Sequence, residues 1–479
     1  MKPLIVLLKT PNANYFFDAN KDEMISVNEE SFRYLSCLQA DENTEIGVMP
    51  PELLELKEQG YLKTESNIKE ISHAYNEYLE FFLDRKLAML TLQLTQDCNL
   101  RCKYCIYSEE HSSRQRSHSI KSISWEIAKK AVDFFLAHSI DNPEVNIGFY
   151  GGEPLLEFSL LKRIIEYAKE CFAGRKLTFN MTTNATLLTD EMILYLKEQD
   201  VTMMISLDGP KEINDLNRIF IDGSGTFDTV SERVSRIKEI CPDYAEKLMI
   251  SMVMDPENDF DCINAINIDG SEFNKLTISP TLVEREYGEE NPQFSSNYVW
   301  KTEYQFFLAM LSHYGRYPKE DVSPIADSRL ARSLDEYTRT CSGSFLRETD
   351  VPSGPCIPGQ MRLFVNVDGL LFPCERVSEK SQAMCIGSLD EGFNLEKAKD
   401  VLGIGTLTKE ECKKCWCFRY CSLCAKKADD EFGKLSAEVK LSFCNEAKSR
   451  AYQNLEQYLL FKEIPQFYSR QLSIKEEEL

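Results

Sequence analysis

The sequence predicts an α/β fold built on a parallel sheet that is closed, or partly closed, as a barrel. From residue 88 onward, apolar strand-like segments alternate with amphipathic helix-like segments, a pattern typical of parallel sheets. Three cysteines follow the first of these strands, at the strand end where such barrels carry their chemistry. The chain has 479 residues, long enough for roughly two to four domains, and the segments on either side of the barrel differ from it in pattern.

Composition narrows the class of protein. The hydrophobic fraction of 43% is sufficient for buried cores, and no apolar run of about 18 residues occurs, so we expect no membrane span. The N-terminus lacks the small-residue cleavage site of a signal peptide, which predicts a cytoplasmic protein. A formal net charge of −22 argues against a general nucleic-acid binder. The 17 cysteines are bunched, which favours metal or redox chemistry over secreted disulfides.

Residues 1–75 form the first expected unit. Three short strands are predicted at residues 3–9, 14–20 and 24–27, followed by a helix with Asn28 as its N-cap. A second helix is predicted with Pro51 near its start and Gly60 at its end. This order of elements predicts a winged-helix-like module. Residues 76–87 are expected to be a helical linker.

The barrel is expected over residues 88–335. Six strands are predicted at residues 88–95, 145–150, 176–183, 202–207, 248–254 and 275–280. Helices are predicted among and after them, including residues 124–139, 159–172 and 297–314. Because catalytic groups of such folds gather at the carboxyl ends of the strands, the loop after the first strand is the candidate site.

That loop contains Cys98, Cys102 and Cys105 in a C-x3-C-x2-C pattern. A structural zinc site needs four ligands, whereas three thiolates in one compact loop suit a 4Fe–4S cluster with one iron left open. An open iron can chelate a substrate, and Tyr104 would cover the cluster and limit access of solvent. The alternatives are ordinary buried cysteines or a zinc knuckle.

Together with later motifs, this loop resembles the signature of radical S-adenosylmethionine (SAM) enzymes. The segment "GFYGGEPLL" is similar to the family's GGEP motif, "TTNATLL" to its TNG motif with Ala185 in place of glycine, and "ISLDGP" follows the fourth strand. The resemblance assigns SAM contacts to Gly151, Gly152, Glu153, Pro154, Asn184, Ser206 and Arg218, and cluster ligation to Cys98, Cys102 and Cys105. Glu153 and nearby carbonyls would receive the SAM amino group, Ser206 the ribose, and Arg218 the carboxylate. The alternatives are a surface ion pair for Arg218 and a turn cap for Asp208.

The resemblance also implies the fold and the chemistry. It implies a partial (β/α)6 barrel, in agreement with the six strands expected from the pattern. SAM would bind the open iron, and its one-electron cleavage would give a 5′-deoxyadenosyl radical that removes hydrogen from an unactivated carbon. The cofactors carry that chemistry, while the barrel supplies orientation and a dry cavity.

The C-terminal region, residues 336–450, is rich in cysteine. The segment "RLFVNVDGLLFPC" predicts a hairpin that turns at Asp368-Gly369 and ends close to Cys374. We expect it to be a scaffold for clusters rather than a packed core. Eight thiols are enough for two further cubanes, at Cys356, Cys374, Cys412, Cys415, Cys417, Cys421, Cys424 and Cys444. A zinc-binding tail is the alternative. Residues 451–479 are expected to be a C-terminal helix or tail.

This region resembles a SPASM domain, the extension of peptide-modifying radical SAM enzymes that holds two auxiliary 4Fe–4S clusters. By resemblance, the cluster farther from the barrel would use Cys412, Cys415, Cys421 and Cys444, and the nearer one Cys356, Cys374 and Cys424. Cys424 departs from the family spacing, since it follows Cys421 by three positions rather than four. The fourth ligand of the nearer cluster is left open between Cys341, Cys417 and a thiolate of the substrate.

The whole arrangement resembles the peptide maturases that make thioether bridges, the sactipeptide and ranthipeptide synthases. The resemblance implies a leader-peptide recognition element in residues 1–75 that binds a ribosomally made precursor at a sheet edge. It also implies a flavodoxin-type reductase as electron donor. The alternatives are a stabilising or dimerising front domain, formylglycine formation or a carbon–carbon cross-link as the reaction, and a non-enzymatic iron–sulfur or redox protein.

Overall fold

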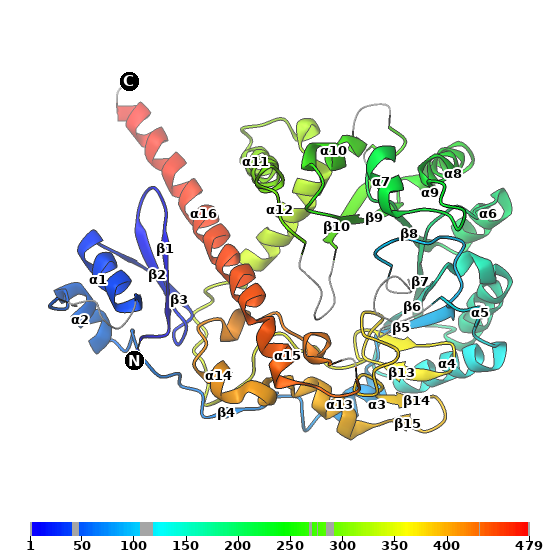
Figure 1. Ribbon diagram of the computed structural model, residues 1–479, viewed down its shortest axis with the longest axis horizontal. Helices are drawn as coiled ribbons and strands as arrows, with labels where there is room; N and C mark the ends of the chain where they lie inside the picture. The colour runs from blue at the N-terminus through cyan, green and yellow to red at the C-terminus, as the bar shows by residue number, and fades with distance from the viewer. Residues whose placement is uncertain are drawn as a thin grey trace.

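The computed structural model describes residues 2–40, 47–105, 118–267, 271–274, 276–283, 292–430 and 432–477, with side chains to residue 464 except that of residue 267. Figure 1 shows a small N-terminal unit beside a long C-terminal helix, and a curved sheet with helices on its outer side. The cysteine-rich segment lies below both. No helix in the described part of the chain combines the length and the apolar character that a membrane span requires.

The N-terminal unit is a three-stranded antiparallel sheet with two helices. Its strands are β1 (Ile5–Lys9), β2 (Asn14–Asp18) and β3 (Glu23–Val27), and its helices are α1 (Glu29–Gln39) and α2 (Pro51–Glu58). These are the predicted elements, and the Asn28 side chain caps α1 by accepting a hydrogen bond from the Ser31 N–H at 2.8 Å. Phe16 packs with the helices, whereas Phe17 packs with α16 (Cys444–Glu477). The sheet is therefore covered on both faces.

A buried carboxylate anchors this unit to the C-terminal region. Asp22, in the turn before β3, is fully buried and has a φ of 56°. It accepts hydrogen bonds from the Tyr420 hydroxyl and from the Ser342 N–H and hydroxyl. The N-terminal unit is thereby joined to the segment that contains Cys417 and Cys421.

The predicted linker is helical only in part. Helix α3 (Leu79–Arg85) lies within residues 76–87, and residues 75–78 form turns. Just before it, β4 (Glu70–Ile71) pairs in parallel with β11 (Thr349–Asp350).

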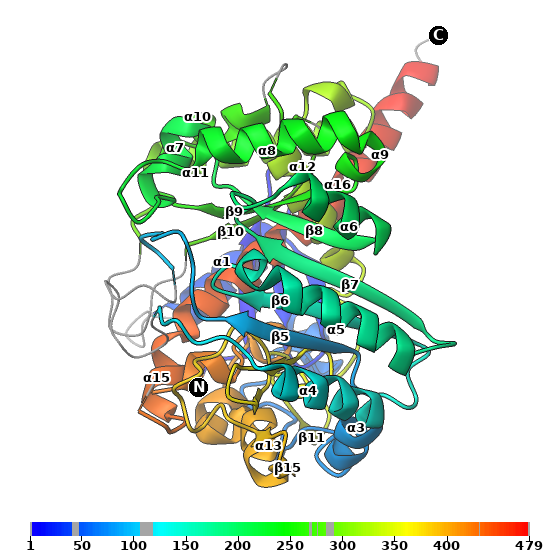
Figure 2. The same ribbon diagram turned by 90° about the vertical axis from the view of Figure 1, so that its right-hand side faces the viewer.

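The central sheet contains six parallel strands, close to the predicted positions. They are β5 (Met89–Thr95), β6 (Glu144–Gly151), β7 (Lys176–Thr183), β8 (Val201–Ser206), β9 (Met249–Met254) and β10 (Thr277–Leu282), arranged side by side in chain order. The helices of this part are α4 (Trp125–His138), α5 (Phe158–Cys171), α6 (Asp190–Glu198), α7 (Lys211–Asn217), α8 (Phe227–Ile240), α9 (Pro242–Ala245), α10 (Phe260–Asn264), α11 (Ser296–His313) and α12 (Pro324–Tyr337). Figure 2 shows α4, α5, α6 and α8 on the outer face of the sheet.

The predicted hairpin extends this sheet. Strand β12 (Leu363–Val365) pairs in parallel with β5, and β13 (Leu370–Phe372), β14 (Gly387–Ser388) and β15 (Gly392–Phe393) continue as antiparallel neighbours. Gly369 turns the hairpin with a φ of 78°. Phe364 and Phe372 are fully buried in the main hydrophobic core. The expectation that the hairpin is not part of a packed core is therefore wrong, because its apolar side chains complete the core beside β5. Its role as a scaffold for clusters stays a prediction.

The C-terminal region consists of short helices around the cysteines. These are α13 (Leu395–Leu402), α14 (Lys409–Lys413) and α15 (Ala437–Ser442), followed by α16. Helix α16 begins at Cys444, so it starts inside the cysteine-rich segment and not at the expected boundary of residue 451. Leu455 and Leu459 of α16 are buried against the N-terminal sheet.

Candidate active site and cluster-binding cysteines

The first cysteine group lies at the carboxyl end of β5, in a loop that we call the barrel loop, residues 96–105. The Cys98 N–H donates to the Asp97 carboxylate at 2.8 Å, the Leu100 N–H donates to the Cys98 sulfur at 3.4 Å, and the Cys105 N–H donates to the Cys102 carbonyl at 3.1 Å. Burial, with a smaller contribution from the charge of Cys105, raises the pKa of Cys98 and of Cys102 to about 12. The three thiols are therefore close enough to act on one another.

The end of α7 and the end of β7 hold the barrel loop in place. The Arg101 N–H donates to the Ile219 carbonyl at 2.8 Å, and the Lys103 N–H donates to the Asn217 carbonyl at 3.1 Å. From the end of β7, the Asn184 amide donates to Asn99 at 2.9 Å and lies 3.8 Å from the Cys98 sulfur. The residue predicted from the TNG-like motif is thus beside a predicted ligand.

Two glycines after β6 let the chain run directly against the barrel loop. The Gly152 N–H donates to the Thr95 carbonyl at 2.8 Å, and the Glu153 N–H donates to the Asp97 carbonyl at 2.9 Å. A Cβ atom on Gly152 would lie 2.0 Å from the Asp97 carbonyl oxygen, and Gly151 has a φ of 137°. Only glycine fits this approach. Pro154 follows as the first residue of a 3-10 turn, Pro154–Glu157.

The Glu153 carboxylate is 1% exposed and faces the end of β7. It accepts hydrogen bonds from the Thr183 hydroxyl at 2.7 Å, the Asn184 N–H at 2.8 Å and the Leu155 N–H at 3.0 Å. Burial raises the pKa of Glu153, and these donors oppose the rise. Glu153 therefore fixes the relative positions of two strand ends, and its predicted contact with a SAM amino group stays a prediction.

A buried ion pair supports the barrel loop from β8. Arg218 Nε lies 3.0 Å from the Asp208 carboxylate, and the two side chains are 9% and 2% exposed. The Tyr104 hydroxyl donates to the same carboxylate, and the Arg218 guanidinium lies 5.5 Å from the centre of the Tyr104 ring. Burial raises the pKa of Cys102, and the charge of Arg218 opposes that rise.

This arrangement decides two of the alternatives left open by the sequence. Arg218 is not a surface ion-pair residue, because its partner Asp208 is buried. Asp208 does more than cap a turn, since it also accepts a hydrogen bond from the Val253 N–H of β9 at 3.1 Å. Ser206 ends β8 and is half-buried opposite Ser251. Its contact with a ribose, and that of Arg218 with a carboxylate, remain predictions.

The inner face of the sheet is polar, which the sequence analysis missed. Because side chains alternate along a strand, Leu90, Leu92 and Leu94 of β5 pack in the core, whereas Thr91, Gln93 and Thr95 face the opposite side. On the neighbouring strands, the buried Oδ1 atoms of Asn146 and Asn180 have no hydrogen-bond partner among the described residues. Alternation of polar and apolar residues in these strand sequences was the available signal.

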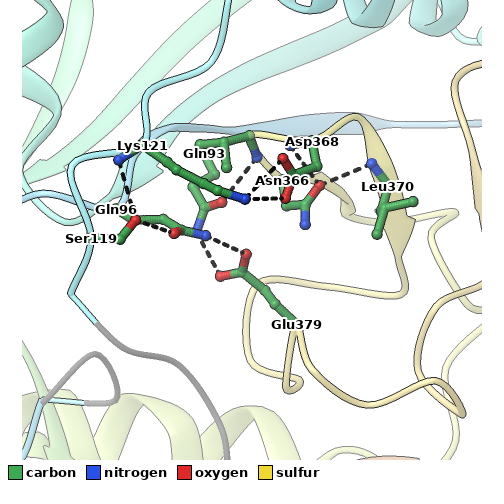
Figure 3. A network of polar contacts seen from close by, with 9 residues as sticks. Gln93, Gln96, Ser119, Lys121, Asn366, Asp368, Leu370 and Glu379 are labelled. Atoms are coloured by element: carbon green, nitrogen blue, oxygen red, sulfur yellow. Dashed lines mark hydrogen bonds and ion pairs between the residues drawn. The ribbon is translucent and has the colours of Figure 1, made fainter. Parts of the chain in front are cut away.

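A polar network joins β5, the barrel loop and the hairpin (Figure 3). The Gln93 side chain accepts from the Val367 N–H at 3.0 Å and donates to Glu379 at 2.6 Å. Gln96 lies beside the same Glu379 carboxylate at 3.5 Å and accepts from the Ser119 hydroxyl at 2.7 Å. The loop that follows Cys374 is thus fastened to the loop that contains Cys98.

The C-terminal cysteines lie in two groups, and their ligation of clusters stays a prediction. The first, which we call the hairpin thiols, comprises Cys356, Cys374 and Cys424; burial raises the pKa of Cys356 and of Cys374, and the charge of Cys424 adds to both rises. The second, which we call the tail thiols, comprises Cys412, Cys415, Cys421 and Cys444; burial raises the pKa of Cys415, Cys421 and Cys444, and the charge of Cys412 adds to each rise.

The structure places the two candidate extra ligands away from the hairpin thiols. Cys417 is buried and is influenced by the tail thiols Cys415, Cys421 and Cys444. Cys341 packs in the cluster of residues between the N-terminal sheet and α16, near Asp22. Cys417 stands between Cys415 and Cys421 in the chain, so its place follows from the sequence, whereas that of Cys341 depends on packing between distant segments.

The donor sets fit iron–sulfur clusters. Among the residues described, no three His, Cys, Asp or Glu side chains converge as ligands of a single metal ion. A cubane takes each thiolate on a different iron, so its ligands need not converge on a single point. The barrel loop and the hairpin thiols each provide three cysteines, and the tail thiols provide four.

Comparisons with known proteins agree with this geometry. Residues 92–267 match the Radical SAM superfamily. A protein of Methanocaldococcus jannaschii is 35% identical over a segment that covers 29% of this chain and 46% of that protein. The serine-type anaerobic sulfatase-maturating enzyme of Bacteroides thetaiotaomicron is 32% identical over a segment that covers 30% of this chain and 34% of that enzyme. The cysteine-type anaerobic sulfatase-maturating enzyme of Clostridium perfringens is 26% identical over 70% of this chain and 87% of its own. This chain thus spans less than half the length of the first two relatives.

Solved structures share the fold. The structure of anSMEcpe with bound AdoMet and a peptide has a TM-score of 0.56 at 22% identity and covers 78% of this chain and 99% of its own. The α/β radical SAM fold with a mixed central sheet is therefore common to both. Because the match covers 78% of this chain, about a fifth of the chain has no counterpart in that structure.

Proposed function

We propose that this chain is a radical SAM enzyme that joins a cysteine sulfur to a carbon of another residue in a ribosomally made precursor peptide. The observation that carries the proposal is that two three-cysteine groups belong to the same sheet. The barrel loop follows the carboxyl end of β5, and Cys374 of the hairpin thiols follows β13, which β12 connects to β5 and which ends toward the amino end of β5. The network through Gln93 and Glu379 supports it, because it fixes the two groups relative to each other.

In this proposal the barrel loop holds a 4Fe–4S cluster through Cys98, Cys102 and Cys105. With SAM bound, that cluster supplies the 5′-deoxyadenosyl radical that removes a hydrogen atom from the substrate. Gly151 and Gly152 keep the chain close to the loop, and Asn184 is placed beside the Cys98 sulfur. The buried Arg218–Asp208 pair and Tyr104 limit the access of water to Cys102.

The hairpin thiols provide three ligands, so the fourth position of their cluster is proposed for the thiolate of the substrate cysteine. The separate locations of Cys341 and Cys417 support this choice over a fourth protein ligand. A substrate sulfur held there would be fixed in position relative to the carbon radical. Fixing both partners is where proximity contributes most to such a reaction.

The proposed recognition surface is the N-terminal sheet. Strands β1 and β3 are its two edges, and a strand edge can take up an extended peptide through main-chain hydrogen bonds. The proposed partners are therefore a cysteine-containing precursor whose leader pairs with one of these edges, and a flavodoxin-type reductase that supplies electrons.

Formylglycine formation is the second candidate. The likeness to cysteine-type anaerobic sulfatase-maturating enzymes favours it, because this relative is matched over 87% of its length. In that reaction a substrate cysteine would be oxidised and lose its sulfur. In thioether formation the sulfur would stay, and each link would remove two hydrogens.

The test uses full-length protein reconstituted with iron and sulfide without air, then supplied with SAM, dithionite and a short cysteine-containing peptide encoded beside it. We expect 5′-deoxyadenosine and a peptide that has lost two hydrogens and one free thiol per link, located by digestion and mass spectrometry. A peptide that has lost its sulfur would favour formylglycine formation. Absence of 5′-deoxyadenosine would contradict both candidates and leave a non-enzymatic iron–sulfur protein.

A second experiment addresses the ligands of the hairpin thiols. Cys424→Ala is expected to lower the iron content by about four atoms per chain, because one cubane is lost. Cys341→Ala is the matched control and is expected to leave the iron content unchanged. Equal losses in the two variants would contradict the proposed three-thiol site.

A further inference from the structure

Lys440 is a buried cation among the tail thiols. It lies in α15 and is 2% exposed. Its ammonium group donates to the Thr408 hydroxyl at 2.6 Å and lies 3.5 Å from the Cys412 sulfur. The Thr408 hydroxyl is itself 3.2 Å from the same sulfur. Within the described part of the chain, no carboxylate forms an ion pair with Lys440.

A desolvated ammonium group requires a negative partner, since an unpaired buried charge is strongly unfavourable. The group that faces the Lys440 ammonium is the Cys412 sulfur, which would be a thiolate as a ligand of the proposed cluster. The Cys444 thiol lies beside the same residue, 3.9 Å from the Lys440 carbonyl oxygen. The positive charge of Lys440 is therefore complementary to the negative charge of a cluster bound by the tail thiols.

We propose that Lys440 is a positioning residue that raises the reduction potential of the auxiliary cluster held by Cys412, Cys415, Cys421 and Cys444. A hydrogen bond to a ligating sulfur and a nearby positive charge both stabilise the reduced cluster, which carries one more negative charge than the oxidised cluster. The inference rests on the proposed binding of a cluster by the tail thiols. It adds a residue outside the cysteine pattern that sets how readily this cluster accepts an electron.

The test is a potentiometric titration followed by electron paramagnetic resonance. The full chain carries C98A, C102A and C105A, so that the spectrum reports only the two C-terminal clusters. In K440M we expect the reduced-to-oxidised ratio of one cluster to fall about tenfold at a fixed solution potential. For a one-electron couple this corresponds to a reduction potential that is lower by about 59 mV. K440R, which keeps the charge, is expected to stay near the parent value.

Lys409→Met is the matched control, because Lys409 is exposed at the start of α14 and carries the same charge. An unchanged ratio in K440M with full iron content would overturn the proposal. Loss of iron in both K440M and K440Q would also overturn it, since Lys440 would then be needed to hold the cluster rather than to tune it. The titration requires neither SAM nor peptide, so its failure is distinct from failure of the proposed reaction.

Discussion

The barrel loop and the tail thiols achieve the same kind of donor set by different routes. In the barrel loop, three cysteines lie within eight residues, and the ends of β6, β7 and β8 hold them through Gly152, Asn184 and Asp208. The tail thiols come from α14, from a short irregular segment and from the start of α16. The first site is set by the edge of a sheet, whereas the second is set by packing among short helices.

This difference has a consequence for charge. The barrel loop has a cation, Arg218, that is already paired with Asp208, so the pair as a whole is neutral beside Cys102. The tail thiols have Lys440, whose neighbours are a hydroxyl and a sulfur. We therefore expect the two regions to respond differently when a charged residue is changed, and the following predictions examine that expectation.

The largest expected effect separates the chemistry of the two cysteine regions. Cys102→Ala removes one iron ligand of the barrel loop, and 5′-deoxyadenosine formation is expected to fall to the level of a control without enzyme. Cys356→Ala is expected to retain SAM cleavage but to give no cross-linked peptide. Both products are measured by chromatography and mass spectrometry. SAM cleavage by the Cys102 variant would remove the distinction between the regions.

The second prediction concerns the paired cation of the barrel loop. Asp208→Asn leaves the Arg218 charge buried without its partner, and we expect the free energy of unfolding to fall by about 3 kcal/mol. Denaturant unfolding followed by circular dichroism measures the change. Asp141→Asn, in the exposed pair with Arg85, is the control and is expected to have little effect. Equal losses in both variants would show that burial of the first pair is unimportant.

The third prediction tests the connection between the regions. Glu379→Ala leaves the fully buried Gln93 amide without one acceptor, so we expect a loss of about 1–2 kcal/mol in the free energy of unfolding. The exposed Glu396→Ala on α13 serves as the control. If the two variants unfold at the same denaturant concentration, the link through Gln93 does not hold the hairpin against β5.

The smallest expected effect is at Ala185, which stands where the TNG motif has glycine. Ala185 has a φ of 63° and is fully buried. Glycine would relieve backbone strain of about 1–2 kcal/mol but would lose about 0.8 kcal/mol of methyl burial. We expect Ala185→Gly to change the free energy of unfolding by less than about 1 kcal/mol in the same assay. A loss well above this would show that the methyl group packs better than its burial alone indicates.

Much of the barrel site could be predicted from the sequence, because its residues follow strands that are themselves visible as apolar segments. The strand pattern placed the three cysteines after the first strand, and the resemblance to radical SAM motifs pointed to both glycines and Arg218. The structure brings these residues beside the barrel loop, and their cofactor contacts stay predictions. The pairing of β12 with β5 was not predicted, since it joins segments more than 250 residues apart and no local pattern encodes it. The burial of Lys440 against Thr408 and Cys412 depends on tertiary packing in the same way, because these residues come from another helix region.

The proposed reaction requires that the barrel loop hold a cluster with one iron open to SAM. The most direct measurement is the electron paramagnetic resonance spectrum of the reduced, reconstituted protein that carries C356A and C412A, titrated with SAM. We predict that the spectrum of the remaining cluster changes with saturation as SAM binds. A cubane whose spectrum is unaffected by SAM, or a protein that binds zinc in place of iron, would contradict it.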